Sequence, residues 1–105
     1  MNKVARFETD SAQRYLETLC QHFGRKVETH YTSNTGWVRF PFGRCDMTAD
    51  VRQLEMVAEG KDAKALDQVV DVVTRHLERY AFRENPRLEW HTTSIAEPSP
   101  AKQGF

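Results

Sequence analysis

Residues 44–59 read RCDMTADVRQLEMVAE, and this stretch decides how the chain folds. Polar and apolar residues alternate on both sides of Asp50-Val51-Arg52, as is typical of strands with one buried face. The three central residues suit a tight turn, so the stretch predicts an antiparallel β-hairpin. The buried faces of the hairpin are expected to carry Cys45, Met47 and Ala49 on one strand and Leu54, Met56 and Ala58 on the other.

The alternation extends back from this hairpin to Val27, so the predicted sheet has more than two strands. Residues 33–36 (SNTG) have turn chemistry and separate a strand at 27–32 from a strand at 37–40. Pro41 must end the second strand because it has no amide hydrogen for a ladder, and Phe42-Gly43 then forms a corner. Four antiparallel strands are therefore predicted between residues 27 and 59.

A helix is predicted before these strands, over residues 11–23. Asp10 and Gln13 have the spacing of a capping box, in which each side chain accepts or donates across the first turn. Gly24 follows the last apolar residue and is expected to close the helix in the left-handed conformation. Apolar residues at three- and four-residue spacing form one stripe, which consists of Ala12, Tyr15, Leu16, Leu19 and Phe23.

A second helix is predicted after the strands, beginning at Asp62 as its N-terminal cap. Asn85-Pro86 is expected to end it, because the residue before a proline is driven out of the helical region. The longest apolar stripe of the chain lies in this helix and consists of Leu66, Val69, Val70, Val73, Leu77 and Tyr80.

Short strands are predicted at both ends, at residues 4–9 and 88–91, which gives the order β-α-β-β-β-β-α-β. The predicted fold class is α+β: an antiparallel sheet with both helices packed on one face, in the manner of helix-grip and TATA-binding-protein-like folds. Residues 1–93 are expected to form the single domain. Residues 94–105 offer almost nothing to bury and are predicted to be a disordered C-terminal tail.

The sheet face away from the helices is expected to be mostly solvated, with an apolar spot at Trp37 and Val57. The polar residues that the alternation assigns to this face are Glu28, His30, Arg39, Arg44, Asp46 and Glu55.

Composition excludes a strong long-range field, because the 105 residues include 15 basic and 15 acidic side chains. A neutral chain does not favour nucleic acid or an anionic membrane as a partner. No apolar run approaches the roughly 20 residues that cross a bilayer, and the N-terminus has no apolar signal-peptide core. Two cysteines are too few for a disulfide framework, so a cytoplasmic protein with reduced thiols is predicted.

Three segments carry a family resemblance: residues 14–16 (RYL) with 19–26 (LCQHFGRK), residues 40–44 (FPFGR) and residues 75–83 (RHLERYAFR). In this order they resemble the small bacterial proteins known as domain of unknown function 2218 (DUF2218), from about Val4 to Trp90. The resemblance implies no reaction. It implies an iron or siderophore setting, since family members occur alone or joined to flavin-containing siderophore-interacting reductases. An aldolase role finds no support, because no lysine lies on a clearly apolar face.

A metal or haem site would need some of Cys20, His22, His30, Cys45, His76 and His91, which are suitable ligands by type. Cys20 and His22 are two apart on a helix, about 200° around its axis, and therefore diverge. No metal, cofactor or catalytic residue is predicted, and both cysteines are expected in or beside the core. A thiol nucleophile has no local imidazole to activate it.

Residues 39–44 (RFPFGR) interleave arginine with aromatic rings, which is one way to bind single-stranded nucleic acid. A proline-glycine corner with its phenylalanines turned inward explains the same residues, and the neutral chain favours that explanation. Nucleic-acid binding is therefore kept only as an alternative.

The leading hypothesis is a small accessory domain that binds a small apolar ligand or a protein partner, including a second copy in a homodimer. The predicted surface joins the ends of the first helix to the 40–44 corner and contains His22, Lys26, Trp37, Arg44 and His76. The alternative is an enzyme or carrier in iron–siderophore handling that uses His22, Arg44 and His76. An apolar pocket with two convergent polar groups would favour a ligand, and a filled core with an exposed Trp37 patch would favour a protein partner.

Overall fold

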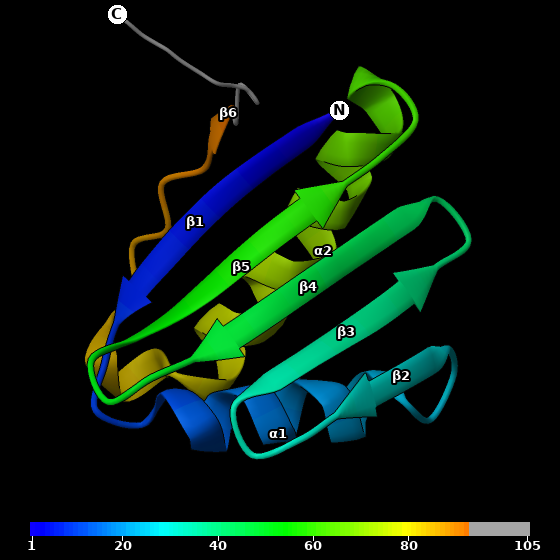
Figure 1. The fold of residues 1–105 in the computed structure, drawn as a ribbon. Coiled ribbons are helices and arrows are strands. Elements are labelled where there is room, and N and C mark those ends of the chain that lie inside the picture. The colour runs from blue at the N-terminus through cyan, green and yellow to red at the C-terminus, as the bar shows by residue number, and fades with distance from the viewer. Residues whose placement is uncertain (93–105) are drawn as a thin grey trace, which may run out of the picture.

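The hairpin at residues 44–59 lies at the centre of a six-stranded antiparallel sheet (Figure 1). The computed structural model describes residues 1–92. The sheet order is β2-β3-β4-β5-β1-β6, in which β1 pairs antiparallel with β5. The strands are β1 (Asn2–Glu8), β2 (Glu28–Tyr31), β3 (Thr35–Phe40), β4 (Gly43–Ala49), β5 (Gln53–Glu59) and β6 (His91–Thr92).

Two helices, α1 (Ala12–Phe23) and α2 (Ala63–Tyr80), cover the same face of the sheet, and a short 3₁₀ helix, η1 (Phe82–Glu84), follows α2 (Figure 1). The predicted α+β class and element order are confirmed. The other sheet face has no covering layer within residues 1–92, as a largely antiparallel sheet allows.

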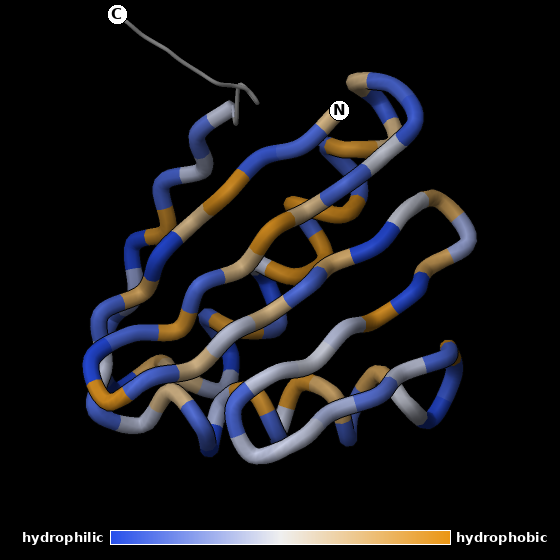
Figure 2. The backbone as a smooth tube through the Cα atoms, in the orientation of Figure 1, coloured by the Kyte–Doolittle hydropathy of each residue, from blue (hydrophilic) through white to orange (hydrophobic). Residues whose placement is uncertain are grey.

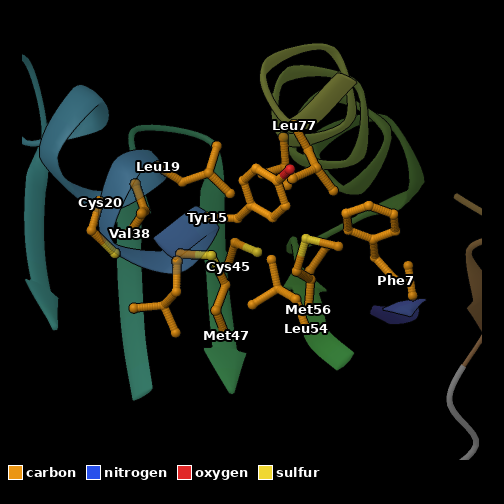
Figure 3. Close-up of a cluster of buried hydrophobic side chains, with 14 of the residues drawn as sticks. Phe7, Tyr15, Leu19, Cys20, Val38, Cys45, Met47, Leu54, Met56 and Leu77 are labelled. Atoms are coloured by element: carbon orange, nitrogen blue, oxygen red, sulfur yellow. The ribbon is translucent and has the colours of Figure 1, made fainter. Parts of the chain in front are cut away.

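The core lies between the helices and the sheet, where side chains from both layers meet (Figure 3). Hydrophobic and hydrophilic residues alternate along the central strands (Figure 2). Burial alternates in the same way along β4 and β5, so the apolar side of each strand faces the core. All six residues predicted for the buried faces of the 44–59 hairpin are buried. Met47 and Met56 therefore pack within the core instead of facing solvent.

The helix caps agree only partly with the sequence. Asp62 caps α2 as predicted, because its Oδ1 accepts a hydrogen bond from the amide of Ala65 at 2.8 Å. The capping box of Asp10 and Gln13 is wrong: Ser11 occupies the cap position of α1 and no side chain caps the first turn. The Thr9 hydroxyl accepts from the amide of Ser11 at 3.0 Å, just before the first turn.

Gly24 does not take the predicted left-handed conformation, since its φ is −62°. A close approach explains the glycine instead. A Cβ at this position would lie 2.8 Å from Oγ1 of Thr29, closer than packed atoms approach.

The chain after α2 departs from the sequence prediction. The helix ends at Tyr80, five residues before Asn85, because η1 tightens the chain there and Asn85 then adopts a left-handed φ of 51°. The final strand is only His91–Thr92, paired with β1, and not 88–91. The Trp90 indole donates to the Thr74 hydroxyl at 2.8 Å and ties this segment to α2. The tail predicted at 94–105 lies outside the described residues.

A hydrogen-bonded clasp joins three segments at the N-terminal end of α1. The hydroxyls of Thr9 and Tyr15 both donate to the carboxylate of Glu84 in η1. Burial and this hydrogen bond raise the pKa of Tyr15, so the phenol stays protonated and remains a donor. The clasp therefore fixes the start of α1 against the end of α2.

Candidate functional site

The His22–His76 groove is an apolar pocket of about 400 Å³ at the end of α1 opposite the clasp. The end of α1, the middle of α2 and the corner between β3 and β4 meet there. Its lining consists of His22, Phe23, Arg25, Lys26, Val27, Phe40, Pro41, Phe42, Val72 and His76. A volume of this size lies at the small end of the range of ligand pockets, which runs from about 300 to 1,000 Å³.

Aromatic rings form one wall of the groove. Phe23 and Phe40 meet edge to face, with centroids 5.1 Å apart and planes at 87°. Phe40 and Phe42 lie parallel, with centroids 5.2 Å apart and planes at 5°. Phe23 and Phe40 are buried while Phe42 is partly exposed, so the wall runs from the core to the surface.

The two histidines of the groove lie side by side, with ring centroids 4.8 Å apart. His76 Nδ1 is 2.6 Å from the carbonyl oxygen of Val72, one helical turn earlier. A carbonyl oxygen only accepts hydrogen bonds, so Nδ1 must carry the proton and Nε2 is left as the second polar atom of the ring. The local helix backbone thus fixes both the orientation and the tautomer of His76.

His22 is half-buried and its pKa is lowered. Desolvation is the largest cause, and His76 and the positive charges of Arg25, Arg79 and Lys26 act in the same direction. The neutral imidazole is therefore favoured at pH 7, as a polar group without charge at the edge of an apolar pocket.

The rim of the groove is positively charged. Arg25 and Lys26 are exposed, and neither forms a salt bridge within residues 1–92. The lining includes no aspartate or glutamate. The groove therefore has two positive side chains at its rim and no carboxylate in its lining to pair with them.

The structure divides the residues that the sequence predicted for one surface. His22, Lys26 and His76 line the groove. Trp37 and Arg44 lie on the open face of the sheet, where the Arg44 guanidinium is stacked 4.8 Å from the centre of the Trp37 ring. The two groups belong to opposite faces of the sheet.

Charges on the open face are paired. Arg44 donates to both carboxylate oxygens of Asp46, and Arg39 pairs with Glu28 at 3.0 Å. Arg6 pairs with Glu55 at 2.9 Å. The arginines of the 39–44 segment are therefore already engaged by carboxylates, which weakens the argument for contacts with phosphates.

Neither cysteine supplies a reactive group. Cys20 and Cys45 are both completely buried, and burial raises the pKa of Cys20 to about 11 and that of Cys45 further still. Both stay as thiols and pack as small apolar residues, as Figure 3 shows. Within residues 1–92, no three His, Cys, Asp or Glu side chains gather as a metal site.

A hollow of about 530 Å³ shares Phe40 and Phe42 with the groove, but its lining has no histidine and includes Glu59. Two larger hollows, each of about 620 Å³, lie near the clasp end of the molecule. Both contain acidic and basic side chains together: Asp10 and Arg14 in one, Glu8 and Arg52 in the other. They lack the convergent histidines and the aromatic wall, so the smaller groove is the better candidate site.

The sequence analysis named the 40–44 corner and expected its phenylalanines to turn inward, which Phe40 does while Phe42 is partly exposed, but it assigned no role to Val72. Val72 lies one turn before His76, and its carbonyl holds the imidazole. The helical spacing of four contained this signal, since residues i and i+4 share a face.

Comparisons with known proteins agree with the fold and add no activity. Within the described residues, no helix has the length and apolar character needed to span a membrane. No functionally curated protein matches the sequence. The NMR structure of PA4090 from Pseudomonas aeruginosa is similar, with a TM-score of 0.74 and 30% sequence identity over 86% of this chain and 94% of that chain. The model of a family described as "uncharacterized protein conserved in bacteria" matches residues 4–91. The chain therefore belongs to this bacterial family, DUF2218.

Proposed function

We propose that this protein is a small accessory domain that binds an apolar ligand in the His22–His76 groove. One observation carries the proposal: two imidazoles, 4.8 Å apart, converge at the edge of a pocket with an apolar aromatic wall. A mostly apolar pocket with a few convergent polar groups is the usual form of a small-molecule site.

Binding is favoured over catalysis by the chemistry of the lining. Its residues include no carboxylate, hydroxyl or thiol, so the only groups that exchange protons near neutral pH are the two histidines. A nucleophile would have to come from Cys20 or Cys45, whose pKa values are raised by burial. The alternative of an enzyme therefore has less support than a binding domain.

The setting that we propose for this binding is iron–siderophore handling in the cytoplasm, which the family resemblance implies. A direct measurement is the rate of a siderophore-interacting reductase with and without this protein. A change in rate with at least one siderophore supports the setting, and equal rates across several siderophores would remove it while leaving the groove untouched.

The groove itself is tested by NMR with a panel of small organic fragments added to ¹⁵N-labelled protein. We expect amide shifts at residues 22–27 and 72–76 and at Phe40 and Phe42. Val72→Trp fills the groove and should abolish them, whereas Thr48→Trp adds the same ring to the exposed face of β4 and should not. Shifts that spread over the surface, or that survive in Val72→Trp, would overturn the proposal.

A further inference from the structure

We propose that the ligand of the His22–His76 groove is a small aromatic carboxylate, a flat ring with one negative charge. This inference rests on the proposed ligand-binding function and names the chemical class of the ligand. Two independent features of the groove carry it: the charge of its rim and the shape of its wall.

The charge of the rim selects an anion. Arg25 and Lys26 stand at the groove, and Arg79 of α2 lies near enough to affect His22. None of these three forms a salt bridge within residues 1–92. A carboxylate at the mouth would satisfy donors that now face water, because guanidinium and ammonium groups are the natural partners of carboxylates.

The positive charge of the rim also disfavours a metal ion, although histidine is a common metal ligand. The histidine pair has no carboxylate or thiolate beside it in the lining, and the charged side chains of the lining, Arg25 and Lys26, are positive. A divalent cation would therefore meet repulsion and only two imidazole ligands, fewer than the three or four of common zinc sites.

The shape of the wall selects a flat ring. Phe40 and Phe42 present parallel rings, and Phe23 and His76 approach each other with centroids 4.7 Å apart and planes at 53°. A further aromatic ring can stack beside Phe42 or meet these rings edge to face, which are the favoured geometries of aromatic pairs. An aliphatic chain would gain burial but not this geometry.

The imidazoles lie between the apolar wall and the charged rim. Neutral His22 and the fixed ring of His76 offer polar atoms there without a net charge that would compete with the arginine and lysine. When pH falls, protonation of His22 adds a positive charge beside those of Arg25, Lys26 and Arg79. Binding of a carboxylate should then strengthen until the carboxylate itself takes up a proton.

The test compares benzoate with benzamide and benzylamine, which share the ring and differ in charge. Each is titrated by NMR into the full chain. We expect benzoate to bind with a Kd on the order of 1 mM, as suits a fragment of its size. Benzamide should bind about tenfold more weakly and benzylamine more weakly still. Raising the salt to about 0.5 M should weaken benzoate but leave benzamide unchanged.

Variants that remove positive charge from the rim test the carboxylate assignment separately from the binding function. Arg25→Gln/Lys26→Gln should reduce the preference for benzoate over benzamide to about twofold or less. Arg52→Gln/Lys64→Gln removes the same charge from exposed positions outside the groove and should preserve the preference. Equal binding of benzoate and benzamide within the groove would overturn the carboxylate assignment and leave the binding function intact. If neither benzoate nor benzamide binds, and no other fragment of the panel binds, both the carboxylate assignment and the binding function are overturned.

Discussion

The segment from Trp37 to Arg44 contributes to two regions of opposite character. Phe40 and Phe42 form the aromatic wall of the groove. The outward side chains of the segment lie on the open sheet face, where Arg39 and Arg44 flank Trp37 and each engages a carboxylate. One short segment therefore has paired charges on one side and borders unpaired charges on the other.

The contrast in charge pairing between the open face and the groove explains how a neutral chain can still have a charged site. On the open face, three arginines have carboxylate partners among the described residues, so little field extends into solvent. At the groove, Arg25 and Lys26 have none. Net charge says nothing about such a local separation, whereas the pairing of each side chain does.

The largest expected effect is a difference in stability between the two regions. Phe40→Ala removes a ring that is 7% exposed and should lower the free energy of unfolding by about 3–5 kcal/mol. Trp37→Ala removes a partly exposed ring from the open face and should cost about 1 kcal/mol. Urea unfolding followed by circular dichroism measures both. If Phe40→Ala does not fold, Phe40→Leu should still lose more stability than Trp37→Ala; similar losses would contradict the contrast.

A smaller effect follows from breaking a charge pair on the open face. Asp46→Asn leaves Arg44 without its carboxylate partner. Both side chains are partly exposed, so the loss of stability should be about 1 kcal/mol or less. Benzoate binding at the groove should not change, and a change of more than about twofold would mean that the two regions are electrostatically coupled.

The smallest effect is the pH dependence contributed by His22. Folding lowers the pKa of His22 from its ordinary value of 6.5. At acidic pH the unfolded chain therefore binds a proton at His22 more readily than the folded chain does. Stability should therefore fall as pH drops from about 7 through the lowered pKa. His22→Gln should make this part of the curve flatter, as measured by urea midpoints between about pH 7 and 5. His30→Gln, on the open face, is the matched control. If the pH dependence of stability changes equally in His22→Gln and His30→Gln, the prediction that His22 contributes a specific part of it is contradicted.

The fold could be predicted from the sequence because its rules are local. The alternation at residues 44–59 and the stripe around Leu66, Val69, Val73 and Leu77 identified side chains that are buried. The errors occurred at ends of elements, where a neighbour in space decides. At the start of α1, the hydroxyl of Thr9 accepts a hydrogen bond from the amide of Ser11, and Asp10 does not cap the helix. At its end, Thr29 lies too close to Gly24 for a side chain to fit there.

The candidate site was only half predictable. His22 and His76 were each identified as edge residues of a helix, but their meeting depends on how α1 and α2 cross, which no local spacing records. Trp37 and Arg44 were assigned to the same predicted surface as His22 and His76. The two-residue period of the strands had already assigned both to the face away from the helices, and Trp37 and Phe40 do lie on opposite faces of β3.

The clasp at Thr9, Tyr15 and Glu84 has a mechanical consequence for the groove. It holds α1 at one end, while Phe23 at the other end forms part of the groove. From Tyr15 to Phe23 the helix extends about 12 Å, at 1.5 Å per residue. The clasp and the groove are thus opposite ends of one helix, so the place of Phe23 in the groove wall is set in part where Tyr15 donates to Glu84.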